Sequence, residues 1–264
     1  MSGVPLVLED KVALITGGSR GIGAETVRLF TQAGARVVFS YRQAQEQAEA
    51  LATECGGPTR CVAIQQELSS SDEGRALVGS AIEAFGQLDI LVANHGIWPA
   101  KDAPISTMAT AQWRQTMSVN LDSVFGLVQA AVGQFERQSR KMPGAPSGHI
   151  VLISSTAGQR GEAYHADYAV TKGALISLTK SLSSELAPKG ILVNCVAPGW
   201  VKTEMSAAAL EDPVRGAQVA ATIPVGRAGT AREIAGPVLF LCTPFAGFIS
   251  GEVLNVNGGA VLVG

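Results

Sequence analysis

The chain has 264 residues, of which 47% are hydrophobic and 16% charged, with 20 basic and 22 acidic side chains. This is an ordinary globular composition, and it excludes a largely disordered chain. The net charge of −2 and the lack of a basic tract argue against a nucleic-acid partner.

No apolar run reaches the roughly 18 residues that span a bilayer, and the N-terminus does not have the pattern of a signal peptide. Four widely spaced cysteines, Cys55, Cys61, Cys195 and Cys242, show no metal-ligand spacing. We therefore expect a cytoplasmic protein with reduced thiols, no metal site and no membrane partner.

Apolar segments of strand length alternate with helical patterns along almost the whole chain. Strands are expected at Lys11–Thr16, Arg36–Tyr41, Arg60–Gln66, Asp89–Ala93, His149–Ser154, Ile191–Val196 and Val253–Val256. Helices are expected at Gly21–Ala33, Gln43–Cys55, Asp72–Phe85, Thr110–Gln138, Ala166–Leu186 and Ala231–Cys242. This alternation predicts an α/β protein with a doubly wound parallel sheet of about seven strands and helices on both faces. No long linker interrupts it, so we expect a single domain over residues 1–264, with an irregular substrate loop at about 198–224.

A glycine-rich turn joins the first expected strand to the first expected helix. Its sequence, Thr16-Gly-Gly-Ser-Arg-Gly-Ile-Gly23, allows a tight turn and a close approach of the backbone to a pyrophosphate. The N–H groups and the positive dipole end of the following helix would hold the anion. The alternative is a tight turn that binds nothing. The residues expected at the phosphates of a dinucleotide are Gly17, Ser19, Arg20, Gly21, Ile22 and Gly23.

The end of the second expected strand indicates which dinucleotide would bind. A carboxylate there would accept the ribose 2′-hydroxyl of NAD, and it would repel a 2′-phosphate. This chain has Tyr41 followed by Arg42, and Arg20 can reach the same place from the glycine turn. Although both arginines could be ordinary surface residues, the pattern predicts NADP(H).

A tyrosine and a lysine, Tyr168 and Lys172, lie four residues apart in a helical pattern and so share one helix face. A nearby ammonium favours the phenolate and lowers a tyrosine pKa that is otherwise near 10, which suits acid–base chemistry. Such a pair also occurs by chance on exposed helices. Ser155, however, follows the end of an expected strand, where ligands meet open α/β sheets, and it could hold a substrate oxygen.

The TGxxxGxG turn, the serine and the Tyr-x-x-x-Lys pair together resemble the short-chain dehydrogenase/reductase family, from about Lys11 to Gly259. The resemblance implies a Rossmann fold and an NADP(H)-dependent oxidoreductase that moves a hydride between the cofactor and a carbonyl or alcohol carbon. It makes Asn120, Ser155, Tyr168 and Lys172 the catalytic residues, with the asparagine holding a water that relays protons towards the lysine. The other reading of Asn120 is a helix-surface residue. The remaining cofactor contacts that the resemblance implies are Glu67, Leu68, Asn94, Gly96, Tyr168, Lys172, Pro198, Gly199, Val201 and Thr203.

The substrate is the least defined part of this prediction. Pocket walls are expected at His95, Trp98, Gln159, Tyr164, His165 and Trp200, each of which could instead be plain packing. The C-terminal sequences IPVGRAGTAREIA and ISGEVLNVNGG most resemble 3-oxoacyl-[acyl-carrier-protein] reductases. An acidic carrier protein needs a basic docking surface, and Lys189 fits one docking position while Pro146 stands at another, with Arg140 and Lys141 slightly upstream. An acyl-thioester substrate and a small ketone or sugar for a freestanding reductase both remain open.

Two other classes of protein are alternatives to a reductase. A non-catalytic NADP(H) sensor would keep the glycine turn and Arg42 but would not need Tyr168 and Lys172. An epimerase or dehydratase of the extended branch would have different glycine spacing and a longer C-terminal part. The resemblance also implies a homotetramer, or a dimer, in which Thr110–Gln138 and Ala166–Leu186 pair across two-fold axes and the tail Gly258–Gly264 is buried.

Overall fold

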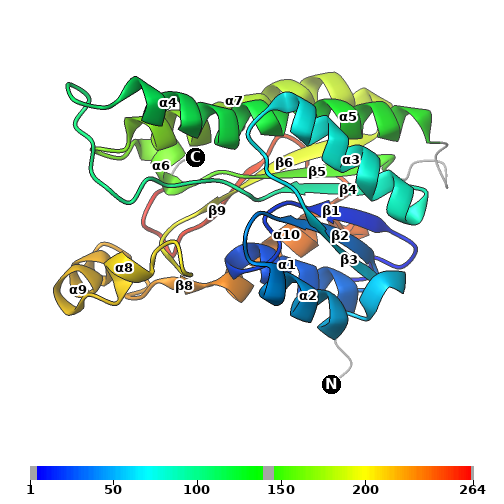
Figure 1. Cartoon of the computed structure of the whole chain (residues 1–264), viewed down its shortest axis with the longest axis horizontal. Helices are drawn as coiled ribbons and strands as arrows, with labels where there is room; N and C mark the ends of the chain where they lie inside the picture. The colour runs from blue at the N-terminus through cyan, green and yellow to red at the C-terminus, as the bar shows by residue number, and fades with distance from the viewer. Residues whose placement is uncertain (1–4, 139–145, 263–264) are drawn as a thin grey trace.

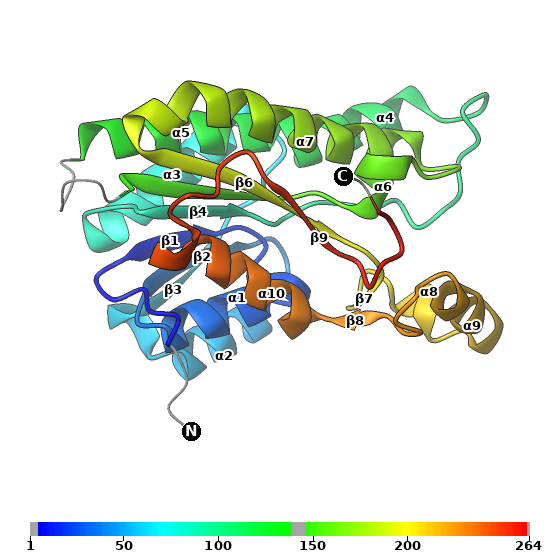
Figure 2. The same cartoon turned by 180° about the vertical axis from the view of Figure 1, so that it is seen from behind.

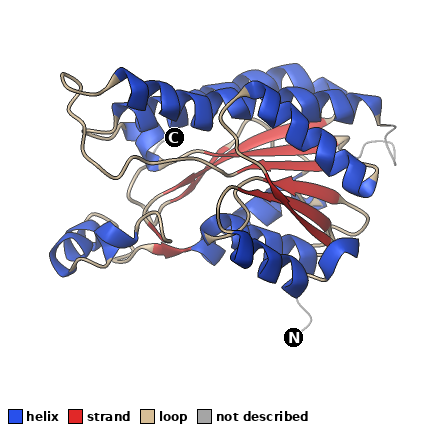
Figure 3. Ribbon diagram, in the orientation of Figure 1, coloured by secondary structure: helices blue, strands red, loops and turns tan. Residues whose placement is uncertain are grey.

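Seven parallel strands form the central sheet, with helices on both faces (Figures 1 and 3). The structure is a computed structural model that describes residues 5–138 and 146–262. The strands, in their order across the sheet, are β3 (Cys61–Gln65), β2 (Arg36–Tyr41), β1 (Val12–Ile15), β4 (Ile90–Ala93), β5 (Gly148–Ile153), β6 (Ile191–Pro198) and β9 (Val253–Val256). The predicted doubly wound parallel sheet of about seven strands is confirmed.

The strands form because their apolar side chains are buried on both faces of the sheet. In β1, Ala13 and Ile15 join one hydrophobic cluster and Leu14 joins the other. The first cluster packs under α1 (Gly21–Gln32), α2 (Gln45–Glu54) and α10 (Ala231–Leu241), which lie together on one face (Figure 2). The second packs under α3 (Ser71–Phe85), α5 (Ser123–Arg137) and α7 (Ala166–Leu186) on the opposite face. Near-continuous apolar strands are typical of sheets covered on both sides.

The position of the site follows from the strand order. β1 and β4 are neighbours in the centre of the sheet, but the chain leaves β1 towards β2 on one side and leaves β4 towards β5 on the other. At such a reversal the connections diverge and leave a crevice beyond the carboxyl ends of the strands. The loops that follow β1 and β4 border this crevice.

Two expected elements differ in detail from the structure. The helix predicted at Thr110–Gln138 is α4 (Thr110–Met117), a π-helical turn at Ser118–Asp122, and α5. The segment at about 198–224, predicted to be irregular, contains β7 (Val201–Lys202), α8 (Ala207–Leu210) and α9 (Pro213–Ala221).

Local interactions explain why α9 forms. Its first residue is Pro213, and the Asp212 carboxylate accepts hydrogen bonds from the backbone N–H groups of Val214 and Arg215. Proline suits the first position of a helix, and aspartate is a favourable N-cap. β7 pairs with β8 (Gly229–Thr230), and α6 (Thr156–Arg160) follows β5.

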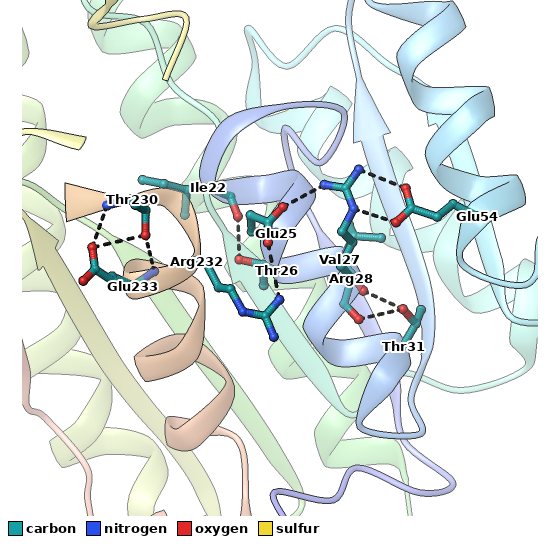
Figure 4. Close-up of polar contacts among 10 residues, drawn as sticks. All are labelled: Ile22, Glu25, Thr26, Val27, Arg28, Thr31, Glu54, Thr230, Arg232 and Glu233. Atoms are coloured by element: carbon teal, nitrogen blue, oxygen red, sulfur yellow. Dashed lines mark hydrogen bonds and ion pairs between the residues drawn. The ribbon is translucent and has the colours of Figure 1, made fainter. Parts of the chain in front are cut away.

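Charged side chains link the three helices of one face (Figure 4). Arg28 of α1 donates to Glu54 of α2 and to Glu25 of its own helix, and Arg232 of α10 lies 3.7 Å from Glu25. The partly exposed pairs are worth only about 0–1 kcal/mol each, so the apolar cluster beneath them remains the main source of stability. Within the two described ranges, every helix is too short or too polar to cross a lipid bilayer.

α3 and α5 touch backbone to backbone at two glycines. A Cβ added to Gly126 would lie 2.0 Å from the carbonyl oxygen of Ser71, and one added to Gly74 would lie 2.3 Å from that of Ser123. Both contacts are with backbone, which cannot move aside as a flexible side chain could. The close crossing of α3 and α5 therefore depends on these two glycines.

We predict that Gly126→Ala lowers the free energy of unfolding by about 3 kcal/mol, because the helices must separate to admit the methyl group. Gly79→Ala is the matched control. Gly79 lies in α3 with nothing within 4 Å of an added Cβ, so alanine there should be neutral or stabilising by about 0.5–1 kcal/mol. Urea unfolding at one fixed protein concentration measures both, and equal effects of the two substitutions would contradict the close contact.

Candidate active site

A cavity of about 520 Å³ opens beyond the carboxyl ends of the central strands. It is lined by residues from the loops that follow the strands and from the first turns of the helices. The predicted site residues that line it are Gly17, Ser19, Arg20, Gly21, Ile22, Tyr41, Arg42, Glu67, Leu68, Asn94, His95, Gly96, Trp98, Ser155, Tyr168, Lys172, Pro198, Gly199, Trp200, Val201 and Thr203. Five further predicted residues lie outside the lining: Gly23, Asn120, Gln159, Tyr164 and His165.

The glycine turn has the shape that a bound pyrophosphate requires. Gly17 and Gly21 have φ values of +63° and +55°, in the left-handed region that favours glycine. A Cβ on Gly23 would lie 2.1 Å from the carbonyl oxygen of Gly17, so this glycine lets α1 pack directly on the turn. The N-terminus of α1 has no side-chain cap and no acidic residue in its first turn. Its N–H groups are therefore suited to an anion, and the turn fits the phosphates of a dinucleotide.

The wall next to the glycine turn lacks a carboxylate where an NAD-type site would need one. Tyr41 at the end of β2 is buried, and the half-exposed Arg42 follows it. The guanidinium of Arg42 lies 3.9 Å from the carboxylate of Glu67, and both side chains are partly solvated. Leu68 is buried beside them. Arg20 borders the same cavity, so two cations face this part of the site.

A buried network joins the ends of β1 and β4. The Thr16 hydroxyl accepts hydrogen bonds from the backbone N–H groups of Asn94 and His95, at 3.0 and 3.2 Å. The Asn94 amide donates to the carbonyl oxygens of Thr16 and Gly17. Asn94 therefore holds the glycine turn against β4.

His95 is a structural histidine. Its Nδ1 lies 2.7 Å from the Thr16 hydroxyl, and its Nε2 lies 2.8 Å from Ser123 Oγ and 3.1 Å from the Val119 carbonyl oxygen. Both ring nitrogens therefore have partners within the protein. Burial, together with the charge of Lys172, lowers the pKa of His95 to about 4, so the ring is neutral at pH 7. Of its two sequence-based readings, the satisfied structural histidine is the one that the contacts match.

Asn120 lies in the π-helical turn and is buried. Its Oδ1 accepts the Ile97 N–H at 2.8 Å, and its Nδ2 donates to the Ile97 carbonyl oxygen and to the Thr171 hydroxyl. The alternative reading of Asn120 as a helix-surface residue is wrong, because its side chain is buried. Its amide instead fixes the loop that follows β4 next to the helix that carries Lys172.

Ser155, Tyr168 and Lys172 line the same cavity. Ser155 is the N-cap of α6, where its hydroxyl accepts the Ala157 N–H, and the same hydroxyl favours the phenolate of Tyr168 and so acts to lower the pKa of that tyrosine. The ammonium of Lys172 lies 5.7 Å from the Tyr168 ring centre and donates to the Ile153 carbonyl oxygen at 2.8 Å. Two hydroxyls and one amine from β5, α6 and α7 therefore share one site.

The pKa of Tyr168 differs from the sequence-based expectation. Burial raises it to about 12, against the opposing effect of the Ser155 hydrogen bond, and the nearby Glu162 raises it further. Burial also lowers the pKa of Lys172 to about 8. The expected lowering of the tyrosine pKa by the lysine is not found, since burial dominates the shift, and Tyr168 is a neutral hydroxyl at pH 7.

Only part of the predicted substrate wall faces the cavity. Trp98 and Trp200 line it, with their rings edge-on at 6.3 Å. His165 is buried behind Trp98, 4.7 Å from its ring, and so does not line the cavity. Gln159 turns away to donate to Asn255 at 2.6 Å, and Tyr164 is 56% exposed.

Several cavity residues were not predicted, among them Ile97, Arg160, Glu162 and Met205. The sequence gives a reason to expect two of these residues, Arg160 and Glu162, at the site. Arg160 and Glu162 stand between Ser155 and Tyr168, and a segment that joins two such groups must pass along the edge of their site. No sequence pattern indicates that Met205 lies at the site.

Comparisons with known proteins agree with this geometry. Residues 17–261 match a family model described as Enoyl-(Acyl carrier protein) reductase. The 3-oxoacyl-[acyl-carrier-protein] reductase FabG of Staphylococcus aureus is 37% identical over 250 residues, which cover 94% of this chain and 97% of that protein. A short-chain dehydrogenase/reductase structure from Brucella melitensis, titled glucose/ribitol dehydrogenase, has a TM-score of 0.88 and 35% identity, covering 98% of this chain and 100% of its own.

A short-chain dehydrogenase structure from Burkholderia cenocepacia, in complex with NADP, has a TM-score of 0.86 and 33% identity, with 96% of this chain and 98% of its own covered. The fold and the site define a dinucleotide-binding α/β protein whose cavity is lined by the Ser155 and Tyr168 hydroxyls. The chain belongs to the short-chain dehydrogenase/reductase family.

The neutral, partly buried His95 predicts a loss of stability in acid. Its pKa in the folded protein, about 4, lies below the ordinary value of 6.5, so the unfolded chain binds more protons between these values and stability falls as the pH drops. Between pH 7 and pH 5 this histidine contributes a loss of about 2 kcal/mol. His95→Asn should lower stability at pH 7 but reduce its fall between pH 7 and pH 5 by about that amount. Chemical unfolding at the two pH values measures this, and an unchanged fall would contradict it.

Proposed function

We propose that this protein uses NADPH to reduce a carbonyl compound to an alcohol, with Tyr168 as the proton donor. The observation that carries the proposal is that Ser155, Tyr168 and Lys172 line the same cavity as the glycine turn, with the Lys172 ammonium 5.7 Å from the Tyr168 ring centre. A non-catalytic sensor would have no use for these three residues. The family membership of the chain supports an oxidoreductase.

Ser155, Tyr168 and Lys172 have separate roles in the reaction. When bound, the nicotinamide supplies a hydride to the carbonyl carbon. Tyr168 and Ser155 hold the carbonyl oxygen, and Tyr168 gives it a proton, for which a neutral hydroxyl with a raised pKa is in the correct protonation state. Lys172, with its pKa near 8, is positioned to return the proton and to orient the nicotinamide ribose.

Asn120 contributes to the reaction by holding neighbouring groups in place. Its amide ties Ile97 and Thr171 together, and its Oδ1 and the Lys172 ammonium both border Gly96, at 3.2 and 3.4 Å from where a Cβ there would stand. We infer that the wide π-helical turn around Asn120 leaves room for a water that leads protons to Lys172. Gly96 leaves space at this point.

We propose NADP(H) as the cofactor. Tyr41 stands where an NAD-type site has an acidic side chain, and the two cations Arg20 and Arg42 border the cavity. Both features support a bound 2′-phosphate. The complex of a family member with NADP supports the same choice. The two arginines reach this wall from the glycine turn and from the end of β2.

The names of the relatives support a 3-oxoacyl thioester as substrate, while one ion pair weakens the case for docking of a carrier protein. Lys189, the expected cation for a carrier protein, lies 2.6 Å from the carboxylate of Glu136, so its charge is already matched. Arg140 and Lys141, the other expected cations, lie outside the described residues. Carrier-protein docking therefore has no unmatched cation at Lys189, and reduction of a free carbonyl compound is the second candidate.

A homotetramer remains our proposal for the assembly. Phe125 on α5 is 52% exposed and Val170 on α7 is 48% exposed. These are the two helices that the resemblance pairs across a two-fold axis, and pairing would bury both apolar side chains. The tail also exposes Leu262, while Val263 and Gly264 lie outside the described residues.

Tyr168→Phe tests the central proposal. We expect it to lose most NADPH oxidation with acetoacetyl thioester and with small ketones, by about 100-fold or more, because the proton donor is gone. Binding of NADPH should persist, since the glycine turn is untouched. Tyr164→Phe is the matched control, because Tyr164 is exposed and outside the cavity lining. Turnover at the wild-type rate in Tyr168→Phe would remove this residue from its role.

Cofactor choice can be measured separately. We expect NADPH to bind about tenfold more tightly than NADH or better, because two cations face the 2′-phosphate. Arg42→Ala should narrow the difference to a few-fold, and Arg137→Ala, on the exposed last turn of α5, should leave it unchanged. Fluorescence titration of both cofactors measures this. Equal dissociation constants for NADPH and NADH in the wild type would contradict the assignment.

A further inference from the structure

Three consecutive residues at the end of β5 contribute to the site in different ways. The Ile153 carbonyl oxygen accepts a hydrogen bond from the Lys172 ammonium at 2.8 Å, and the Ser154 hydroxyl donates to the Lys172 carbonyl oxygen at 2.7 Å. Ser155, the next residue, lines the cavity and is assigned to the substrate oxygen. The side chain of Ser154 has no part in the reaction described above, although it contacts the residue that carries the ammonium.

The hydrogen bond from Ser154 to Lys172 is buried. Ser154 is 3% exposed and Lys172 is 4% exposed, so water does not compete for either partner. The backbone N–H of Ser154 donates to the Val196 carbonyl oxygen of β6, which keeps this residue in line with the sheet. The hydroxyl therefore joins α7 to the sheet at the residue whose side chain enters the reaction.

Helix α6 contacts the same piece of backbone. A Cβ added to Gly158 would lie 2.5 Å from the carbonyl carbon of Lys172 and 2.7 Å from its carbonyl oxygen. This contact limits how closely α6 and α7 approach each other, but it does not draw α7 towards the sheet. The hydroxyl of Ser154 supplies that attraction.

The fixed backbone of Lys172 determines where its ammonium lies. Among the described residues, the Ile153 carbonyl oxygen is the only hydrogen-bond acceptor of this ammonium. One of its three protons is used there, and two remain for the cavity. The nitrogen lies 5.7 Å from the Tyr168 ring centre and 3.4 Å from where a Cβ on Gly96 would stand. A small movement of α7 away from β5 would therefore lengthen the bond to Ile153 and change both other distances.

We propose that Ser154 is a positioning residue, which holds α7 against the end of β5 so that the Lys172 ammonium keeps its bond to Ile153 and presents its remaining protons to the cavity. This inference rests on the proposed carbonyl reduction, because it assigns one more residue to that reaction. Ser154 acts through the lysine and not on the substrate.

The role can be measured on Lys172 itself. Without the Ile153 acceptor the buried ammonium is less well compensated, so the lysine pKa falls further below the value of about 8 that burial already gives it. Three titratable groups surround it, from α7, from the loop after β4 and from β6. Burial holds the pKa of Tyr168 at about 12, that of His95 at about 4 and that of Cys195 at about 11. A titration near pH 8 therefore reports Lys172.

Ser154→Ala tests the inference by NMR titration of isotope-labelled lysine side chains in the cofactor-free protein. The Lys172 signal is assigned by its absence from Lys172→Met. We expect Lys172 of Ser154→Ala to titrate about 0.5–1 pH unit below the wild type. With NADPH and either an acetoacetyl thioester or small ketones, kcat should fall about tenfold, because the lysine is displaced. The KM for NADPH should stay within about threefold, because the lysine is still present.

Ser183→Ala is the matched control. Ser183 lies on α7 about three turns beyond Lys172, and its hydroxyl oxygen lies 2.8 Å from that of Ser250, so alanine there also removes a bond between α7 and another segment. Ser183 is outside the cavity lining, and its variant should match the wild type in kcat and in the Lys172 titration. Urea unfolding verifies that both alanine variants are folded under the assay conditions.

The outcomes distinguish this inference from the proposed function. An unchanged Lys172 titration in Ser154→Ala overturns the inference even where turnover falls, because Ser154 would then act on the ligand or on stability alone. Equal losses of kcat in Ser154→Ala and Ser183→Ala also overturn it, since any weakened contact of α7 would have the same effect. A wild type that binds NADPH but reduces no carbonyl compound overturns the proposed function, and the titration still decides whether Ser154 positions Lys172.

Discussion

The buried hydroxyl of Thr16 is the point on which both halves of the site depend. Thr16 is fully buried between β1 and β4, the two strands at which the direction of the fold reverses. Its hydroxyl binds the backbone of Asn94 and His95, and the His95 ring extends the network to Ser123 at the start of α5. The glycine turn on one side and the π-helical turn on the other are thus held by one set of hydrogen bonds. A polar network in a low-dielectric interior is rigid when every member is satisfied.

The fold was predictable because its pattern is local and repeated. Apolar strands alternate with helical periodicity, and this alone indicates a parallel sheet covered on both faces. The pattern does not indicate the π-helical turn, since Ser118–Asp122 has no distinctive composition, and only the family resemblance implied a local helix irregularity at Asn120. α9 could have been predicted from Asp212 and Pro213, since an aspartate followed by a proline is typical of a helix start. The rest of that segment has the composition of a loop.

The site was predictable to the extent that its residues lie close together in sequence. The geometry of the glycine turn and of the Tyr168–Lys172 pair is fixed by a few neighbouring residues, and the cavity lining includes both. Side-chain direction was not predictable, because Gln159 turns to Asn255, which is distant in sequence. The pKa of Tyr168 was misjudged for a related reason. The spacing to Lys172 suggested a lowered pKa, whereas the observed shift comes mainly from burial, which depends on all the segments that enclose the ring.

The π-helical turn allows one helical rod to serve two unrelated neighbours. α4 faces α7, where Thr116 and Gln112 donate to the buried carboxylate of Asp167, while α5 faces α3 through Gly126. An α-helix rotates by about 100° per residue, so a rod of this length without a wide turn would present one of these faces in the wrong direction. The wide turn changes the rotational register of α5 relative to α4, so each part of the rod can present the face that its own neighbour needs.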